Sequence, residues 1–153
     1  MFEQGIAYFS LHTLPPGHLL AWQPAWSILI HLYADAGKPR IQGAQQFTDS
    51  EMCLLLPLLQ AHPGHCSYAS MLAHYHSPDG TSIEQLVAQI DAWLKEAQGT
   101  QAWEQQMQPV RDLFVQMHSK LQALGLDIGA VLGTGYVLLG REQEQGRGAS
   151  QSL

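Results

Sequence analysis

The chain has 153 residues, about one domain's length, which is enough to bury roughly two thirds of the surface that the unfolded chain would expose. Only 13% of its residues are Asp, Glu, Lys or Arg, and thirteen acidic against seven basic side chains give a formal net charge of −6. This charge repels nucleic acid at long range unless the few cations gather on one face, and no uninterrupted apolar stretch approaches the length of about 18 residues that marks a membrane-spanning helix.

Four short strands are predicted in residues 1–46, where they form an antiparallel sheet. Turn residues separate them: Pro15-Pro16-Gly17, Pro24 and Asp35-Ala36-Gly37. The third strand is the clearest, because apolar residues alternate along it and include β-branched and aromatic types. The predicted strands are residues 5–11, 18–23, 27–33 and 39–46.

Two short helices are predicted next. Thr48 followed by Glu51 is a capping box, in which the threonine oxygen and the glutamate carboxylate each accept a free amide of the first turn. Pro57 lies inside this helix and is expected to kink or shorten it. His62-Pro63-Gly64 cannot continue a helix, and Ser67 is then the N-cap of a second one.

A third helix is predicted over residues 81–97, capped by Thr81 with Glu84 at the capping-box position and ended by Gly99. Its apolar stripe is larger than a surface helix needs, so we expect a second copy of the chain to cover it. The predicted homodimer uses this helix or the N-terminal sheet. The stripe consists of Ile83, Leu86, Val87, Ile90, Trp93 and Leu94.

The last predicted helix covers residues 110–124 and carries one stripe of helical period. Residues 101–108 can begin it, with Pro109 near the first turn of the main segment. After Gly125 the pattern predicts a β-hairpin that turns at residues 133–135, and the polar tail from 141 to 153 is expected to be disordered. The stripe consists of Val110, Phe114, Met117, Leu121 and Leu124.

The ordered set of these features resembles the winged-helix effector domain of OmpR/PhoB-type response regulators. The resemblance covers residues 47–139, the N-terminal strands are similar to that family's N-terminal sheet, and the segment 81–108 and the tail lie outside it. It implies an α+β fold in which residues 1–46 form an N-terminal antiparallel β-sheet of the same domain and residues 47–140 form a winged helix-turn-helix with an inserted helix and a C-terminal β-hairpin wing. The motifs are Thr48-x-x-Glu51, His62-Pro63-Gly64, Ser67 before Met71-Leu72, Lys120-Leu121 ending the 110–121 stripe, and Gly133-x-Gly135-Tyr136.

The resemblance further implies that helix 110–124 is a recognition helix, which enters the major groove of double-stranded DNA while the wing reaches a neighbouring groove or the backbone. Gln116 and His118 stand where the family commonly has arginines that meet DNA, and Leu132 and Val137 stand where its wing usually has them. Because Lys and Arg supply most of the affinity for DNA, binding is expected to be weak unless the protein dimerises. The implied DNA-binding residues are Arg111, Gln116, His118, Ser119, Lys120 and Thr134.

These features predict a cytoplasmic transcriptional regulator of the winged-helix class that binds double-stranded DNA. It acts without a receiver domain, since the residues before Phe47 are too few to form one. The alternative is a winged-helix protein that has lost DNA binding and regulates another protein through helix 81–97 and the recognition helix. The motifs favour the first function and the low basic charge favours the second.

Metal-binding and catalytic patterns are weaker. A cluster of histidines and one cysteine has ligand types that suit zinc or copper, but its spacings match no closed tetrahedral motif. We therefore expect no metal site: His62 belongs to the turn shared with the family, and the other residues are surface polar residues. The pattern of a nucleophile with a base, a carboxylate pair or a phosphate loop is not recognisable, so we expect neither an enzyme nor a cofactor. The cluster consists of His62, His65, Cys66, His74 and His76.

The two cysteines and two of the tryptophans are further candidate functional residues. Cys53 and Cys66 are too few for a disulfide framework and are expected to be reduced thiols. Trp93 and Trp103 are either core residues or anchors of an interface with a partner, where tryptophan is enriched.

Overall fold

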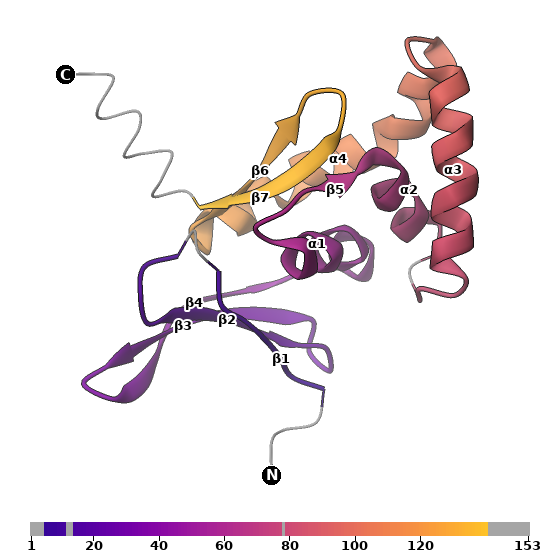
Figure 1. The fold of residues 1–153 in the computed structure, drawn as a ribbon. Coiled ribbons are helices and arrows are strands. Elements are labelled where there is room, and N and C mark those ends of the chain that lie inside the picture. The colour runs from indigo at the N-terminus through magenta and orange to yellow at the C-terminus, as the bar shows by residue number, and fades with distance from the viewer. Residues whose placement is uncertain (1–4, 12–13, 78, 141–153) are drawn as a thin grey trace, which may run out of the picture.

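The structure is a computed structural model that describes residues 5–11, 14–77 and 79–140. These residues form an α+β fold, as predicted, in which helices pack against two antiparallel sheets (Figure 1). The predicted tail, residues 141–153, lies outside the described residues.

The N-terminal sheet consists of four strands in the order β1-β2-β3-β4, each antiparallel to its neighbour. Their positions confirm the prediction to within a few residues at each end. One irregularity interrupts the β3–β4 pairing between His31 and Leu32, where Gln42 is the extra residue on β4. The strands are β1 (Ala7–Phe9), β2 (His18–Gln23), β3 (Ile28–Asp35) and β4 (Lys38–Gln46).

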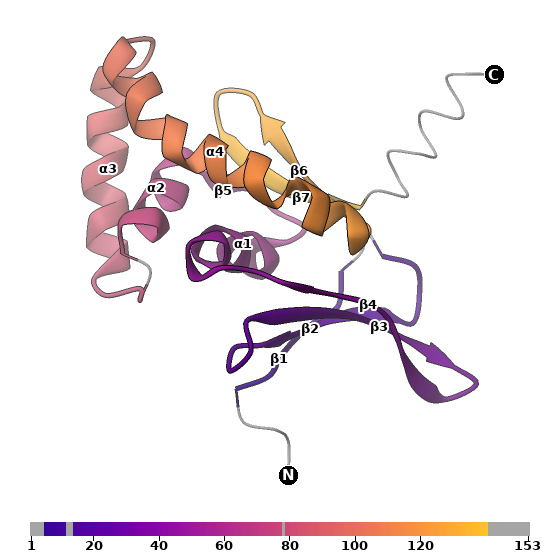
Figure 2. The same cartoon turned by 180° about the vertical axis from the view of Figure 1, so that it is seen from behind.

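The two faces of this sheet are both apolar. The inner face carries Leu20, Trp22 and Leu29, which are buried in the main core. On the outer face, Leu32 pairs with Leu19 on one side and Ile41 on the other, and Tyr8 heads the next row across the strands. Among the described residues, the helices lie on the inner side only (Figure 2). The outer face is therefore an apolar surface without charged residues in its central rows.

Helix α1 (Asp49–Ala61) begins as predicted. The Thr48 hydroxyl accepts a hydrogen bond from the Glu51 amide at 3.1 Å, and the Glu51 carboxylate accepts one from the Thr48 amide at 2.8 Å, which completes the capping box. Pro57 does not shorten the helix, because it lies among buried leucines that hold both turns in the core. After the short strand β5 (Cys66–Ser67), helix α2 (Tyr68–His76) begins at the predicted N-cap, Ser67.

Helix α3 (Ile83–Ala97) stands at the side of the molecule and packs mainly against α2 (Figure 1). The prediction that Thr81 caps it is wrong: the N-cap is Ser82, in the left-handed region with φ 53° and without a capping hydrogen bond from its side chain. Asp79 explains the difference, since its carboxylate accepts a hydrogen bond from the Thr81 amide at 3.0 Å and so holds Thr81 in the preceding turn. Of the six predicted stripe residues, Leu94 alone is buried, and the other five are partly or largely exposed.

Helix α4 (Gln101–Ala123) is a single long helix capped by Thr100. The prediction that Pro109 lies near the first turn is wrong, because the proline is in the helix interior. Its ring removes one backbone hydrogen bond, but Met107 and Val110 on either side are completely buried and keep the helix continuous through this point.

The chain ends in the predicted hairpin, formed by β6 (Leu126–Val131) and β7 (Gly135–Gly140). Strand β7 also pairs with β5, so the second sheet has the order β5-β7-β6. Gly135 is essential to this pairing: a Cβ atom at that position would lie 1.9 Å from the Cys66 carbonyl oxygen. Only glycine lets the two strands approach this closely.

One core joins these elements. Helix α1 lies between the two sheets, and α4 packs against it and against one face of the β6–β7 hairpin (Figures 1 and 2). Phe47, the leucines of α1 and the buried face of α4 are the centre of the core. None of the described helices combines the length and the apolar character that crossing a membrane requires.

Candidate functional site

Lys120, one of the predicted DNA contacts, is held by a buried carboxylate. Its ammonium group lies 2.7 Å from Oε1 of Glu51, whose side chain is 0% exposed, and 5.4 Å from the ring centroid of Phe47. Gln116, one turn earlier on α4, donates a hydrogen bond to Oε2 of Glu51 at 3.3 Å. Two of the predicted contacts therefore bind the capping-box carboxylate at the start of α1.

Opposing effects set the pKa of Glu51. Burial raises the pKa, while hydrogen bonds from Lys120, the Thr48 amide and Gln116, together with the charge of Lys120, lower it, and the net result lies below the ordinary value. Glu51 is thus ionised at neutral pH in a site without water access, and it needs Lys120 as its counter-charge.

Arg111 also interacts with side chains of the same protein. It forms an ion pair with Glu104, lies over the ring of Trp103 at 5.4 Å from the centroid, and interacts with the Tyr136 hydroxyl. The hydrogen bond with Glu104 is the largest of the effects that raise its pKa. Of the described cations, Arg40 and Lys95 have acidic partners as well: Asp35 and Asp91.

The other three predicted DNA contacts, His118, Ser119 and Thr134, are exposed to solvent. Nδ1 of His118 is 3.4 Å from a carboxylate oxygen of Asp127 on β6, and the His118 side chain is half exposed. Ser119 is exposed on α4. Thr134 is exposed in the turn between β6 and β7, where its hydroxyl contacts the Leu132 carbonyl at 3.5 Å. The six residues therefore lie around α4 and the hairpin turn, with Lys120 and Gln116 on the α1 side and Arg111 and His118 on the hairpin side.

Between these two sides runs the most exposed line of α4, which contains Gln108, Asp112, Val115 and Ser119. Gln108 donates a hydrogen bond to Asp112 at 2.8 Å, and Val115 is 77% exposed. This line carries an acid and an aliphatic residue and has no cation, whereas a helix that reads the major groove of DNA needs cations along its outer line.

A groove of about 440 Å³ lies between α4 and β6. Phe114 and Tyr136, whose ring centroids are 4.7 Å apart, contribute aromatic surface to its wall. Beyond the groove, Leu132 in the hairpin turn is 95% exposed. The residues that line the groove are Phe114, Val115, His118, Leu121, Asp127, Ile128, Ala130 and Tyr136.

The groove was only partly visible in the sequence. Leu132 stood out as an apolar residue in a position where the resemblance implies a basic one. Val115 was missed, although an aliphatic residue off the stripe of Val110, Phe114 and Met117 is a signal that could have identified it. The Lys120–Glu51 pair could not be found, because it joins residues that are distant in the chain.

Two residues of the histidine and cysteine cluster, His74 and Cys66, make hydrogen bonds within the protein. Nδ1 of His74 is hydrogen bonded to the Ser70 carbonyl, and the thiol of Cys66 donates to the Pro57 carbonyl at 3.3 Å. Burial raises the pKa of both Cys53 and Cys66 to about 11, so the thiols are protonated and poor ligands at neutral pH. Across residues 5–11, 14–77 and 79–140, no group of three or more His, Cys, Asp or Glu residues is arranged to hold a metal ion.

Comparison with protein-family models, with curated proteins and with solved structures finds no match for this chain.

Proposed function

We propose that this protein is a winged-helix module that binds another protein through the face formed by α4 and the β6–β7 hairpin. In this assignment α1, α2 and α4 are the three helices of the winged helix, the hairpin is the wing, and β1 to β4 are the N-terminal sheet. Helix α3 is an insertion. The order of the elements and the β5-β7-β6 sheet support this assignment.

The observation that carries the proposal is the apolar groove beside exposed Val115 and Leu132. Exposed apolar side chains that adjoin an apolar groove form a continuous patch, and such patches are characteristic of a surface that a partner covers. Phosphate binding needs free cations, whereas Arg111 and Lys120 are already paired with Glu104 and Glu51. The face therefore suits an apolar partner better than a polyanion.

The charges around the groove indicate the chemistry of that partner. Asp112 is exposed on the outer line of α4, and Asp127 lies in the groove wall. The whole chain carries a net charge of −6. An amphipathic helix with leucine-like residues on one face and basic residues beside them would meet both the apolar groove and the acids.

DNA binding is the second candidate function, because a long helix beside a β-hairpin is the arrangement that winged-helix proteins use on duplex DNA. Gln116 could bind adenine through its amide, and Ser119 and Thr134 could donate to phosphates. For this function Arg111 and Lys120 would have to exchange their acidic partners for phosphate groups, which lowers the net gain from each contact.

A synthetic amphipathic helix with leucines on one face and lysines on the other would test the proposed function. We expect it to bind the protein in fluorescence anisotropy, and we expect Val115→Ser and Leu132→Ser each to weaken binding about tenfold, because each removes about one buried aliphatic contact. Both residues are exposed, so the variants should fold normally.

The control variant is Trp26→Ser, which changes an exposed apolar residue in the turn between β2 and β3 and should leave peptide binding unchanged. A scrambled peptide of the same composition controls for charge attraction alone. The opposite outcome would favour DNA binding instead. In that case the peptide does not bind, a mixed-sequence DNA duplex binds the parent protein at low salt, and Arg111→Ala abolishes the binding of the duplex.

We also propose that the protein is a homodimer joined by the outer face of the N-terminal sheet. Tyr8 and Ile41 are exposed there, and Leu19, Ile30 and Leu32 are only half buried. Because the central rows of this face carry no charge, two copies can pack face to face without repulsion despite their net negative charge.

Ile41→Asp tests this interface. The substitution places one buried carboxylate from each copy in the contact, so we expect the dimer dissociation constant in sedimentation velocity to rise at least about tenfold. Val115→Asp is the matched control on the α4 face and should leave the dimer intact. Loss of the dimer in the Val115 variant alone would move the interface to α4, and a monomeric parent protein would refute it.

A further inference from the structure

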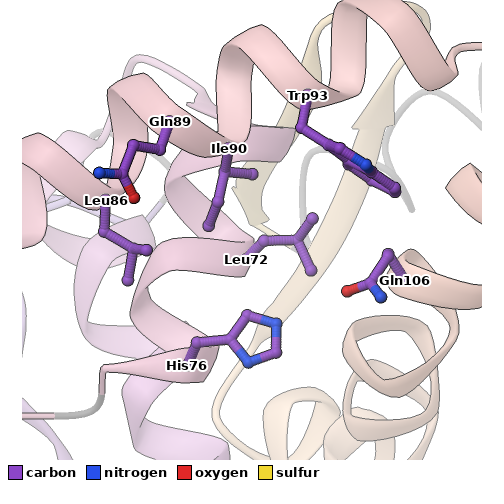
Figure 3. Close-up of a pocket in the computed structure, with 7 residues that line it drawn as sticks. All are labelled: Leu72, His76, Leu86, Gln89, Ile90, Trp93 and Gln106. Carbon is purple, nitrogen blue, oxygen red and sulfur yellow. The ribbon is translucent and has the colours of Figure 1, made fainter.

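A separate pocket of about 270 Å³ opens between α2, α3 and α4, away from the groove described above. Figure 3 shows that the side chains of α3 line one side, Leu72 and His76 of α2 lie opposite, and Gln106 of α4 closes one end. The residues that line the pocket are Leu72, His76, Leu86, Gln89, Ile90, Trp93 and Gln106.

The lining is apolar with a few hydrogen-bonding groups. Leu72 is almost completely buried and contributes to the core, whereas Leu86, Ile90 and Trp93 come from the apolar stripe of α3. His76, Gln89 and Gln106 supply an imidazole and two amides, which offer both donors and acceptors. Of the described residues that line the pocket, none is Asp, Glu, Lys or Arg. This composition is typical of small-molecule sites, which combine apolar walls with a few polar groups.

The pocket lies where α2 and α4 cover only part of the apolar stripe of α3. Leu94 is the one buried residue of α3, and Trp93 remains 38% exposed although it faces the pocket. The stripe of α3 therefore has apolar surface that α2 and α4 leave uncovered at this point. A molecule in the pocket would contact all three helices and would add apolar contacts between α3 and the rest of the protein.

Size and charge limit the class of molecule. The volume is just below the range of roughly 300–1,000 Å³ that is usual for pockets holding larger ligands, so a compound with a single ring fits. A charged compound would lose its hydration in a pocket that offers no opposite charge, which is costly. We propose that this pocket binds a small, neutral ring compound that carries a hydrogen-bonding group. The proposal does not depend on the function assigned to the α4–hairpin face.

Benzamide, benzoate and benzylammonium provide a matched set of probes, because they share one ring and differ in charge. At pH 8, two-dimensional NMR of the labelled protein should show saturable shifts of the Trp93 indole resonance and of the Gln89 and Gln106 side-chain amides with benzamide. We expect a dissociation constant in the millimolar range, as is usual for so small a ligand, and binding of the two ions at least about tenfold weaker.

Trp93→Ala removes one wall of the pocket and should weaken benzamide binding at least about fivefold, since it deletes most of the ring contact. Trp26→Ala is the matched control: Trp26 is 68% exposed in the turn between β2 and β3, and its removal should leave binding unchanged. Absence of saturable shifts, equal binding of benzoate, or binding that survives Trp93→Ala would each overturn the proposal. Peptide binding to the α4–hairpin face is measured separately, so either proposal can fail alone.

Discussion

Replacing Lys120 by methionine is expected to lower the free energy of unfolding by about 3 kcal/mol at neutral pH, because it leaves the carboxylate of Glu51 buried without its counter-charge. Methionine keeps most of the apolar stem, so the loss reports the charge rather than the packing. Urea unfolding followed by circular dichroism measures it. The large effect depends on the complete burial of Glu51 and on the 2.7 Å contact between the two side chains.

The matched control is Lys95→Met, which removes an ion pair between Lys95 and Asp91 on the exposed surface of α3. Such pairs contribute about 0–1 kcal/mol, so this variant should unfold almost like the parent. Equal losses in the two variants would mean that the Glu51 site tolerates an unpaired charge and that water reaches it.

The same pair gives the Lys120 effect a pH dependence. Because the folded-state pKa of Glu51 lies below its ordinary value of 4.5, its contribution to stability is complete above that pH and is lost as the pH falls through the folded-state pKa. In Lys120→Met, burial acts without the compensating cation and raises the pKa of Glu51. The stability difference between parent and variant should therefore shrink as the pH is lowered through these two pKa values.

Gly135→Ala is expected to destabilise the protein by about 3 kcal/mol, because the new methyl group would lie 1.9 Å from the Cys66 carbonyl oxygen and 2.7 Å from the carbon of that carbonyl. Both atoms belong to the backbone of β5 and cannot rotate away. The strands β5 and β7 must separate to accept the change, and the pairs Cys66–Tyr136 and Ser67–Gly135 would be lost.

Gly133→Ala is the control for this prediction. Gly133 has φ +72°, and the space around it is open, so alanine there meets only the strain of the left-handed conformation, about 1 kcal/mol. Thermal unfolding of the two variants compares a steric clash with backbone strain in the same hairpin. A Gly135 variant as stable as the Gly133 variant would show that β5 moves aside at little cost.

Local signals in the sequence predicted much of the fold. The capping box at Thr48 and Glu51, the Ser67 N-cap and the glycines of the last hairpin each depend on neighbouring residues, and the structure has all of them. Thr81 shows the limit of this approach. Its spacing to Glu84 fits a capping box, but the Thr81 amide donates to the Asp79 carboxylate instead, and Thr81 stays in the preceding turn. Pro109 shows another, since burial on both sides outweighed its effect on the helix.

The candidate site was harder to predict for a physical reason. The orientation of the Lys120 side chain depends on Glu51, which lies 69 residues earlier in the chain. The periodicity of α4 does not reveal that partner. Likewise, Val115 lines a groove only because Ile128 and Ala130 of β6 line the same groove, and the sequence of α4 alone does not show this. The low number of cations in α4 was evident from the sequence. The acidic partners of those cations were not, because tertiary packing determines them.

The pairing of β5 with β7 has a consequence for how this chain can change in length. Ser67 pairs with Gly135, so the segment 68–134, which contains α2, α3, α4 and β6, is a loop closed by that contact. The entropy of closing a loop grows only with the logarithm of its length, at about 0.6 kcal/mol for each doubling. A helix such as α3 therefore adds little to the cost of bringing β5 and β7 together, and the segment that carries the pocket can vary in length while the two strands keep their register.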